Sequence, residues 1–137
     1  MRGTGNAYTG TATGFNVAAV PPESAGVEDR WTLSYLGNDR YKIVNQYRNQ
    51  MLRMTQDDYS GTSALSSVAM VSNGTPTTPD QWIVQPYATG GVRLVSDGFG
   101  RPLHSAGDPY MGSTTVLSIC GVPITFNTAE DIWTLGQ

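Results

Sequence analysis

Asp80-Gln81-Trp82-Ile83-Val84 is one of three related segments in the chain. Asp29-Arg30-Trp31-Thr32-Leu33 precedes it and Asp131-Ile132-Trp133-Thr134-Leu135 follows it, at a constant spacing of 51 residues. Further columns keep the same spacing without a gap, namely Met1/Leu52/Leu103, Arg2/Arg53/His104, Tyr8/Tyr59/Tyr110, Gly10/Gly61/Gly112, Thr11/Thr62/Ser113 and Val20/Val71/Val122. The chain is therefore a threefold internal repeat, and a repeat at fixed period constrains every later choice of fold.

Within each unit, short apolar segments alternate with turn residues. In the second unit they are Tyr41 to Asn45, Met51 to Met54, Val68 to Val71 and Trp82 to Pro86. The third unit repeats them at Val92 to Val95, Pro102 to His104, Val116 to Cys120 and Trp133 to Leu135. Their length, and the lack of a long helical apolar stripe, indicate strands. Three units of four strands predict a β-trefoil, a six-stranded barrel closed by three hairpins, because a propeller needs about four blades to close.

We expect a single domain over residues 1–137, with units at about 1–36, 37–87 and 88–137. Three complete units would need 153 residues and the chain has 137, so the first unit lacks the counterpart of Tyr41 to Asn45. Each backbone group left buried and unpaired at that gap costs about 1–3 kcal/mol. Three explanations stay open: a neighbouring segment fills the gap, a homodimer completes the barrel by strand addition, or the sequence is shortened at its N-terminus.

Composition excludes several classes of function. Charged residues make up 14%, the net charge is −3 and the pI is about 4.8, so we expect no nucleic-acid partner. No apolar run approaches the ~20 residues of a membrane span and no signal peptide is visible, so we expect a cytoplasmic protein without membrane insertion. One histidine, His104, and one cysteine, Cys120, cannot repeat a catalytic site threefold or form a zinc cluster. We therefore expect no enzyme, no metal and no cofactor.

At the tryptophan columns the chain resembles the ricin-B-like (R-type) β-trefoil lectins. Tyr41-Lys42-Ile43-Val44-Asn45 matches their opening strand, and their Gln-x-Trp signature occurs here with Asp in place of Gln. The stretch from Thr13 to Pro21 is most similar to small, cysteine-poor mushroom lectins. The resemblance implies carbohydrate binding. The chain departs from the family in two respects. Where the family has the aspartate of a galactose site, this chain has Arg2, Arg53 and His104. Its third strands also lack the family's aromatic residue.

The repeated loop after the second strand is the main candidate for sugar contacts. Each copy supplies an acid or amide and a tyrosine, in the pairs Asn6/Tyr8, Asp57/Tyr59 and Asp108/Tyr110. Carboxylates and amides bind sugar hydroxyls, and an aromatic face covers the apolar side of a pyranose. The structural alternative is that the tyrosines pack over the cap hairpins while the acid and glycine shape the turn.

For two further columns of the repeat, the tryptophans and the aspartates before them, we predict mainly structural roles. We expect the tryptophans in the core, and each aspartate before a tryptophan to fix the preceding loop as the family's glutamine does. By resemblance, a second tier of residues borders the sugar: Asp80, Trp82, Asp131 and Trp133. Arg2, Arg53 and His104 are expected as exposed residues of the cap.

The sequence favours a non-enzymatic lectin with up to three weak sites, used together on glycans or glycoproteins. The mushroom resemblance implies a defensive role. The alternative is a trefoil protease inhibitor that acts through an exposed loop, either Val20 to Glu28 or Ser72 to Pro79.

Overall fold

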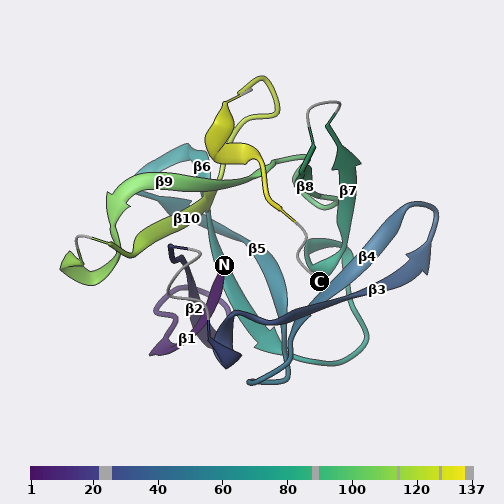
Figure 1. The fold of residues 1–137 in the computed structure, drawn as a ribbon, viewed down its shortest axis with the longest axis horizontal. Helices are drawn as coiled ribbons and strands as arrows, with labels where there is room; N and C mark the ends of the chain where they lie inside the picture. Colours follow the sequence, from purple (N-terminus) through teal and green to yellow (C-terminus); the bar gives the residue numbers. More distant parts are fainter. Residues whose placement is uncertain (22–25, 88–89, 114, 127, 135–137) are drawn as a thin grey trace.

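A computed structural model describes residues 1–21, 26–87, 90–113, 115–126 and 128–134 (Figure 1). These residues form ten strands: β1 (Arg2–Ala7), β2 (Gly14–Ala19), β3 (Trp31–Gly37), β4 (Arg40–Asn45), β5 (Gln50–Tyr59), β6 (Thr62–Ser72), β7 (Trp82–Pro86), β8 (Val92–Ser96), β9 (Leu103–Pro109) and β10 (Leu117–Gly121). The helical turns are short: η2 (Val27–Asp29), η3 (Thr78–Asp80), η4 (Tyr110–Gly112) and η5 (Ala129–Asp131). None of the helices in the described ranges is long or apolar enough to cross a membrane. The predicted all-β fold is confirmed.

The cap of the trefoil consists of three hairpins, β1–β2, β5–β6 and β9–β10. Their second strands, β2, β6 and β10, each pair with the other two and so surround the pseudo-threefold axis (Figure 1). Gly14 lies where β2 pairs closely with β6, and a β-carbon there would collide with the carbonyl oxygen of Met70. The repeat therefore builds a symmetric cap from its second and third strands.

The barrel is formed by the first and fourth strands of the units. β4 pairs with both β3 and β7, β7 pairs with β8, and Val92 bridges Trp133. Units two and three open with β4 and β8, whereas the described part of unit one has no counterpart, as predicted. The predicted last strand is reduced to the bridge at Trp133, and Leu135 lies outside the described residues.

The cap hairpin of unit two is longer than the sequence analysis predicted. Its strands reach Tyr59 and begin again at Thr62, joined through Ser60 and Gly61 with φ of 53° and 72°. Only the inner halves of β5 and β6 are apolar and buried, and these halves alone were recognised as strands. Asp57 and Tyr59, predicted in a loop, are therefore strand residues near a hairpin tip.

The hydrophobic core lies between barrel and cap and follows the repeat columns. Leu52, Leu103 and Trp82 are fully buried in it, and Met1 packs against it from the first column. Trp31 and Trp133 are half-buried and pack against the same cluster. The predicted core position of the tryptophans is confirmed for Trp82 and, as a partial burial, for the other two.

Candidate functional site

The tryptophan column is bonded into the fold in the same way three times. The indole N–H donates to the carbonyl oxygen of the residue 30 positions earlier, which is Met1 for Trp31 (2.9 Å), Leu52 for Trp82 (3.0 Å) and Leu103 for Trp133 (3.0 Å). Trp82, Asp80 and Asp131 are each 0% exposed. They offer no surface to a ligand, which corrects the prediction that they border a sugar. Trp133 stays half-buried against the core.

The aspartates fix the preceding loops, as the sequence predicted. Oδ2 of Asp29 accepts from the backbone N–H of Gly26 at 2.6 Å. Oδ2 of Asp80 accepts from the N–H and hydroxyl of Thr77 at 3.1 and 3.0 Å, and Asp131 accepts from the same groups of Thr128. Each short helical turn before a tryptophan is held by this contact.

The same aspartates contact the second-strand column, through ion pairs in units one and two and a hydrogen bond to a histidine in unit three. Arg2 meets Asp29 at 2.9 Å, Arg53 meets Asp80 at 2.5 Å and His104 meets Asp131 at 2.6 Å, always 27 residues apart. Their side chains are 29%, 28% and 16% exposed, so the prediction of exposed cap residues is wrong. The constant offset between two columns of opposite charge was a signal for these pairs.

The predicted loop residues form three contacts between units, here called the inter-unit tyrosine pairs. The Tyr8 hydroxyl donates to Oδ2 of Asp57 at 2.6 Å, and the Tyr59 hydroxyl donates to Oδ2 of Asp108 at 2.9 Å. The third contact closes the cycle, because Nδ2 of Asn6 donates to the Tyr110 hydroxyl at 3.1 Å. All three tyrosines are half-buried. The structure therefore brings the six residues together as ties between neighbouring hairpins.

The pKa values reflect these contacts. Burial, followed by the hydrogen bond to Asp108, raises the pKa of Tyr59 to about 12. Burial and the contact with Asp57 raise the pKa of Tyr8 as well. The hydrogen bond from Tyr8, then that from the backbone of Thr11, lowers the pKa of Asp57. The phenol oxygens thus remain protonated donors to the carboxylates at neutral pH.

Two surface cavities occupy equivalent places in units two and one. We call them the Arg53 cavity, of about 280 Å³, and the Arg2 cavity, of about 340 Å³. Five of their lining positions are related by the 51-residue repeat: Arg53/Arg2, Thr55/Thr4, Gln56/Gly5, Pro79/Glu28 and Thr11/Ser113. Each cavity thus lies beside the second strand of one unit and a hydroxyl from the hairpin of the preceding one in the cyclic order.

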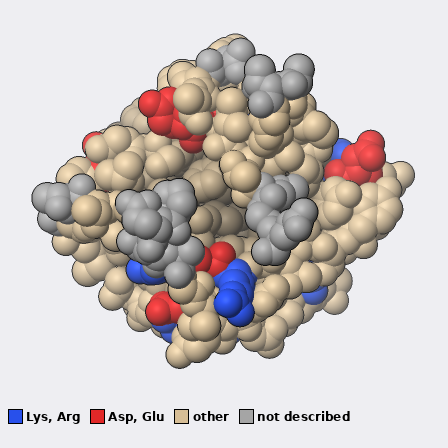
Figure 2. Space-filling model, viewed as in Figure 1, with Lys and Arg blue, Asp and Glu red and all other residues tan. Residues whose placement is uncertain are grey.

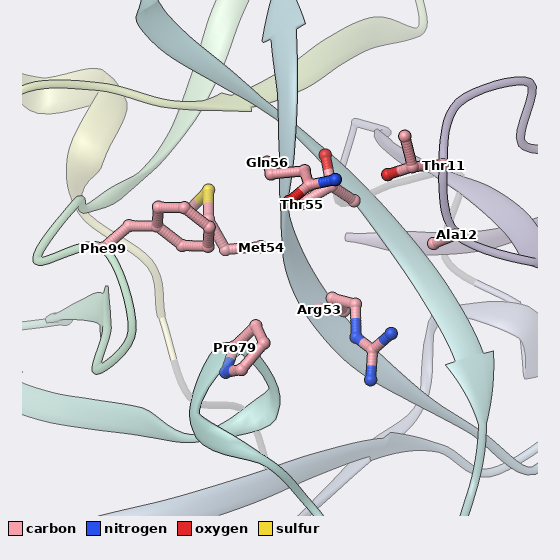
Figure 3. A pocket seen from close by; sticks show the side chains of 8 residues that line it. All are labelled: Thr11, Ala12, Arg53, Met54, Thr55, Gln56, Pro79 and Phe99. Atoms are coloured by element: carbon pink, nitrogen blue, oxygen red, sulfur yellow. The ribbon is translucent and has the colours of Figure 1, made fainter.

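The Arg53 cavity has an apolar side and a polar side (Figure 3). Phe99 and Pro79 lie on one side, Thr11 on the other, and the β5 residues Arg53 to Gln56 run between them. The Phe99 side chain is 40% exposed. Phe99, Pro79, Thr55 and Gln56 were missed by the sequence analysis, because none of them stands out in its own column.

The Arg2 cavity contains two of the predicted residues, Asn6 and Tyr110. Glu28 and Met111 also line it, and Met111 is 73% exposed. The other predicted loop residues, Tyr8, Asp57, Tyr59 and Asp108, line neither cavity.

Charge is sparse on the face shown in Figure 2, where acidic and basic residues form small separate groups around a hollow. Within the described residues, no group of three His, Cys, Asp or Glu side chains is placed to hold a metal ion. The lining of the Arg53 cavity offers hydroxyl, amide, guanidinium and aromatic groups, and that of the Arg2 cavity adds the carboxylate of Glu28.

No known family model matches the sequence, and no curated protein matches it. Solved structures do resemble the fold. A Caenorhabditis elegans protein of unknown function has a TM-score of 0.82 at 14% identity, over 99% of this chain and 85% of its own. The SDF2-like protein of Arabidopsis thaliana has a TM-score of 0.75 at 16% identity, over 97% and 83%. The designed threefold-symmetric protein ThreeFoil has a TM-score of 0.66 at 20% identity, over 96% and 85%. At these identities the likeness shows the β-trefoil fold.

Proposed function

We propose that the protein is a non-enzymatic lectin that binds glycans or glycoproteins through repeated, shallow cavities. The observation that carries this proposal is the repetition of the Arg53 and Arg2 cavities at the same positions of two units. A binding protein gains avidity when one site is displayed more than once on a rigid body, even if each site is weak.

The lining of both cavities suits a saccharide. Exposed polar side chains lie beside the guanidinium in both cavities, Thr11 and Gln56 with Arg53 and Asn6 with Arg2. Phe99 in one cavity and Tyr110 in the other supply an aromatic ring. Sugar hydroxyls need donors and acceptors in close array, and the C–H face of a pyranose packs on an aromatic ring. Volumes near 300 Å³ are at the lower end of small-molecule sites and fit one or two sugar rings.

The resemblance to mushroom lectins supports this assignment and suggests a defensive role. We expect no galactose site of the family's kind, because Arg2 and Arg53 stand in its aspartate column and pair with the aspartates of the signature. The single histidine and the single cysteine both have structural contacts: His104 is hydrogen-bonded to Asp131, and Cys120 is buried. These contacts support the non-enzymatic assignment.

Binding of the purified protein to a glycan array tests the proposal, with its mass in solution measured in parallel. We expect signals that rise steeply with glycan density on the surface. Absence of binding to every glycan at high density would reject the lectin assignment. The mass measurement tests the homodimer that the missing strand suggested.

Residual activity of papain and trypsin tests the inhibitor alternative. Of its two candidate loops, Ser72 to Pro79 is anchored by Lys42, whose Nζ donates to Oδ1 of Asn73 at 2.9 Å. The middle of the other loop, residues 22–25, lies outside the described residues. Stoichiometric inhibition without glycan binding would favour this alternative.

A further inference from the structure

We infer that the Arg53 cavity is the principal sugar site and that it binds a pyranose bearing an acceptor-rich substituent, either an acetamido or a carboxylate group. This inference rests on the proposed function and makes it specific to one unit. It follows from two differences between equivalent positions of the repeat and from the way Arg53 is held.

The first difference is an apolar wall beside Arg53 that has no equivalent beside Arg2. Pro79 of unit two and Phe99 of unit three occupy the register positions of Glu28 in unit one and Arg48 in unit two. Glu28 and Arg48 form an ion pair of 2.7 Å between Oε2 and Nη2. The Arg53 cavity carries a proline and a partly exposed phenylalanine ring instead, and such a surface packs against the C–H face of a pyranose.

The second observation is a fixed hydrogen-bond donor, Arg53, with one nitrogen left unused by the protein. Nε and Nη2 of Arg53 donate to the two carboxylate oxygens of Asp80 at 2.5 and 2.9 Å. Asp80 is fully buried and also accepts from Thr77, so it holds the guanidinium in place without reaching the cavity. Nη1 of Arg53 has no acceptor among the described residues. A donor fixed in this way loses little conformational entropy when it binds a ligand oxygen.

The third observation is the balance of polar groups. Gln56 is exposed and has no hydrogen-bond partner in the described part of the chain, whereas unit one has Gly5 in that column. The lining of the Arg53 cavity contains one guanidinium and no carboxylate. The lining therefore offers hydrogen-bond donors and no negatively charged acceptor. This favours a ligand with an acetamido carbonyl or a carboxylate beside its hydroxyls.

The remaining units differ in chemistry from this site. Glu28 lines the Arg2 cavity and opposes an anionic sugar there. Unit three carries His104, Ala106 and Gly107 in the columns of Arg53, Thr55 and Gln56, so it lacks the guanidinium, the hydroxyl and the amide. The three units are therefore unequal, and unit two supplies the dominant affinity.

The test is an NMR titration with the methyl glycosides of N-acetylglucosamine, glucuronic acid and glucose. We expect the N-acetylated or the carboxylated sugar to bind at least fivefold more tightly than glucose. Sodium chloride at 0.5 M weakens the carboxylate interaction severalfold and leaves the acetamido interaction nearly unchanged, which identifies the substituent.

Variants locate the site. F99A should weaken binding at least tenfold and Q56A about threefold. F126A is the matched control, because Phe126 is 43% exposed, close to the 40% of Phe99, and lines neither cavity; its affinity should stay within twofold of wild type. R53H introduces the residue that unit three pairs with aspartate at this column, so it removes Nη1 while keeping a partner for Asp80. It should also weaken binding at least tenfold.

The results of these experiments distinguish the location of the site from the lectin assignment. If the protein binds glycans on the array but F99A and R53H keep wild-type affinity, this site is wrong and the lectin assignment stands. Glucose binding as tight as that of both substituted sugars would overturn the acceptor-substituent claim. Array binding without binding to any of the three methyl glycosides would also overturn the inference. Absence of binding to every glycan on the array would reject the proposed function itself.

Discussion

The hydroxyl of Tyr8 lies 2.6 Å from Oδ2 of Asp57, and the two residues belong to neighbouring units of the repeat. Oδ2 of Asp57 also accepts from the backbone N–H of Thr11 at 2.8 Å. A sequence column of tyrosines that suggested a platform for sugars thus joins one hairpin to the next. The inter-unit tyrosine pairs are therefore expected to contribute to stability.

Replacement of Tyr59 by phenylalanine tests that contribution. Y59F removes the donor to Asp108 and should lower the free energy of unfolding by about 1 kcal/mol, since water replaces part of a contact near the surface. Urea unfolding measures the change. Y35F serves as the control, because Tyr35 is 62% exposed and should leave stability unchanged. Equal stability of Y59F and wild type would show that the hydrogen bond between Tyr59 and Asp108 does not stabilise the fold.

Stability should fall at alkaline pH. Burial raises the pKa of Tyr59 from its ordinary 10 to about 12 and that of Cys120 from 9 to about 11. The native state keeps both protons where the unfolded chain loses them. The contribution of these two groups to the free energy of unfolding is therefore constant below about pH 9 and decreases up to about pH 12. Urea midpoints between pH 7 and 11 measure this, and a midpoint that rises with pH would contradict it.

The ion pair of unit two should be costly to break. D80N leaves the Arg53 guanidinium without its carboxylate in a site where the aspartate is fully buried. We expect a loss of about 3 kcal/mol in the free energy of unfolding, measured by urea denaturation. D97N is the control, because Asp97 pairs with Arg40 near the surface and its side chain is 23% exposed. Its loss should stay below about 1 kcal/mol; a similar loss in both variants would refute a special role for Asp80.

Cys120 should resist thiol reagents in the native protein. Its side chain is buried, and burial raises the pKa of the thiol to about 11, so the reactive thiolate is scarce at pH 8. Titration with an aromatic disulfide reagent should show no fast reaction without urea and one thiol per chain with urea. Immediate native labelling would place this residue at the surface and contradict the packing of β10.

The repeat predicted the fold because the same columns build each unit. The tryptophans, the aliphatic residues Leu33 and Val84 two positions after them, and Leu52 and Leu103 in the second strand all lie in the core or pack against it. The outer halves of β5 and β6 were missed, since their polar side chains carry no apolar alternation and their pairing depends on the neighbouring hairpins. Local pattern thus identified the buried halves of the strands and left the hairpin tips unrecognised.

The candidate site was less accessible to prediction than the fold. The link between Arg53 and Asp80 was present in the sequence as a constant offset of opposite charges, but each column was interpreted alone. Phe99 and Arg53 line one cavity to which all three units contribute, and tertiary structure alone brings these residues together. The sequence signal for Phe99 is that the residue at the same register position of the preceding unit is Arg48, a charged side chain in place of an aromatic one.

The contact between Asn6 and Tyr110 spans 104 residues and joins the first hairpin to the last. A ribosome must therefore synthesise most of the chain before this contact can form, and until then β2 has no β10 to pair with. Folds dominated by such distant contacts form in milliseconds to seconds, more slowly than helical bundles. The nascent chain consequently passes through a stage in which its earliest strands are exposed to chaperones and to other chains.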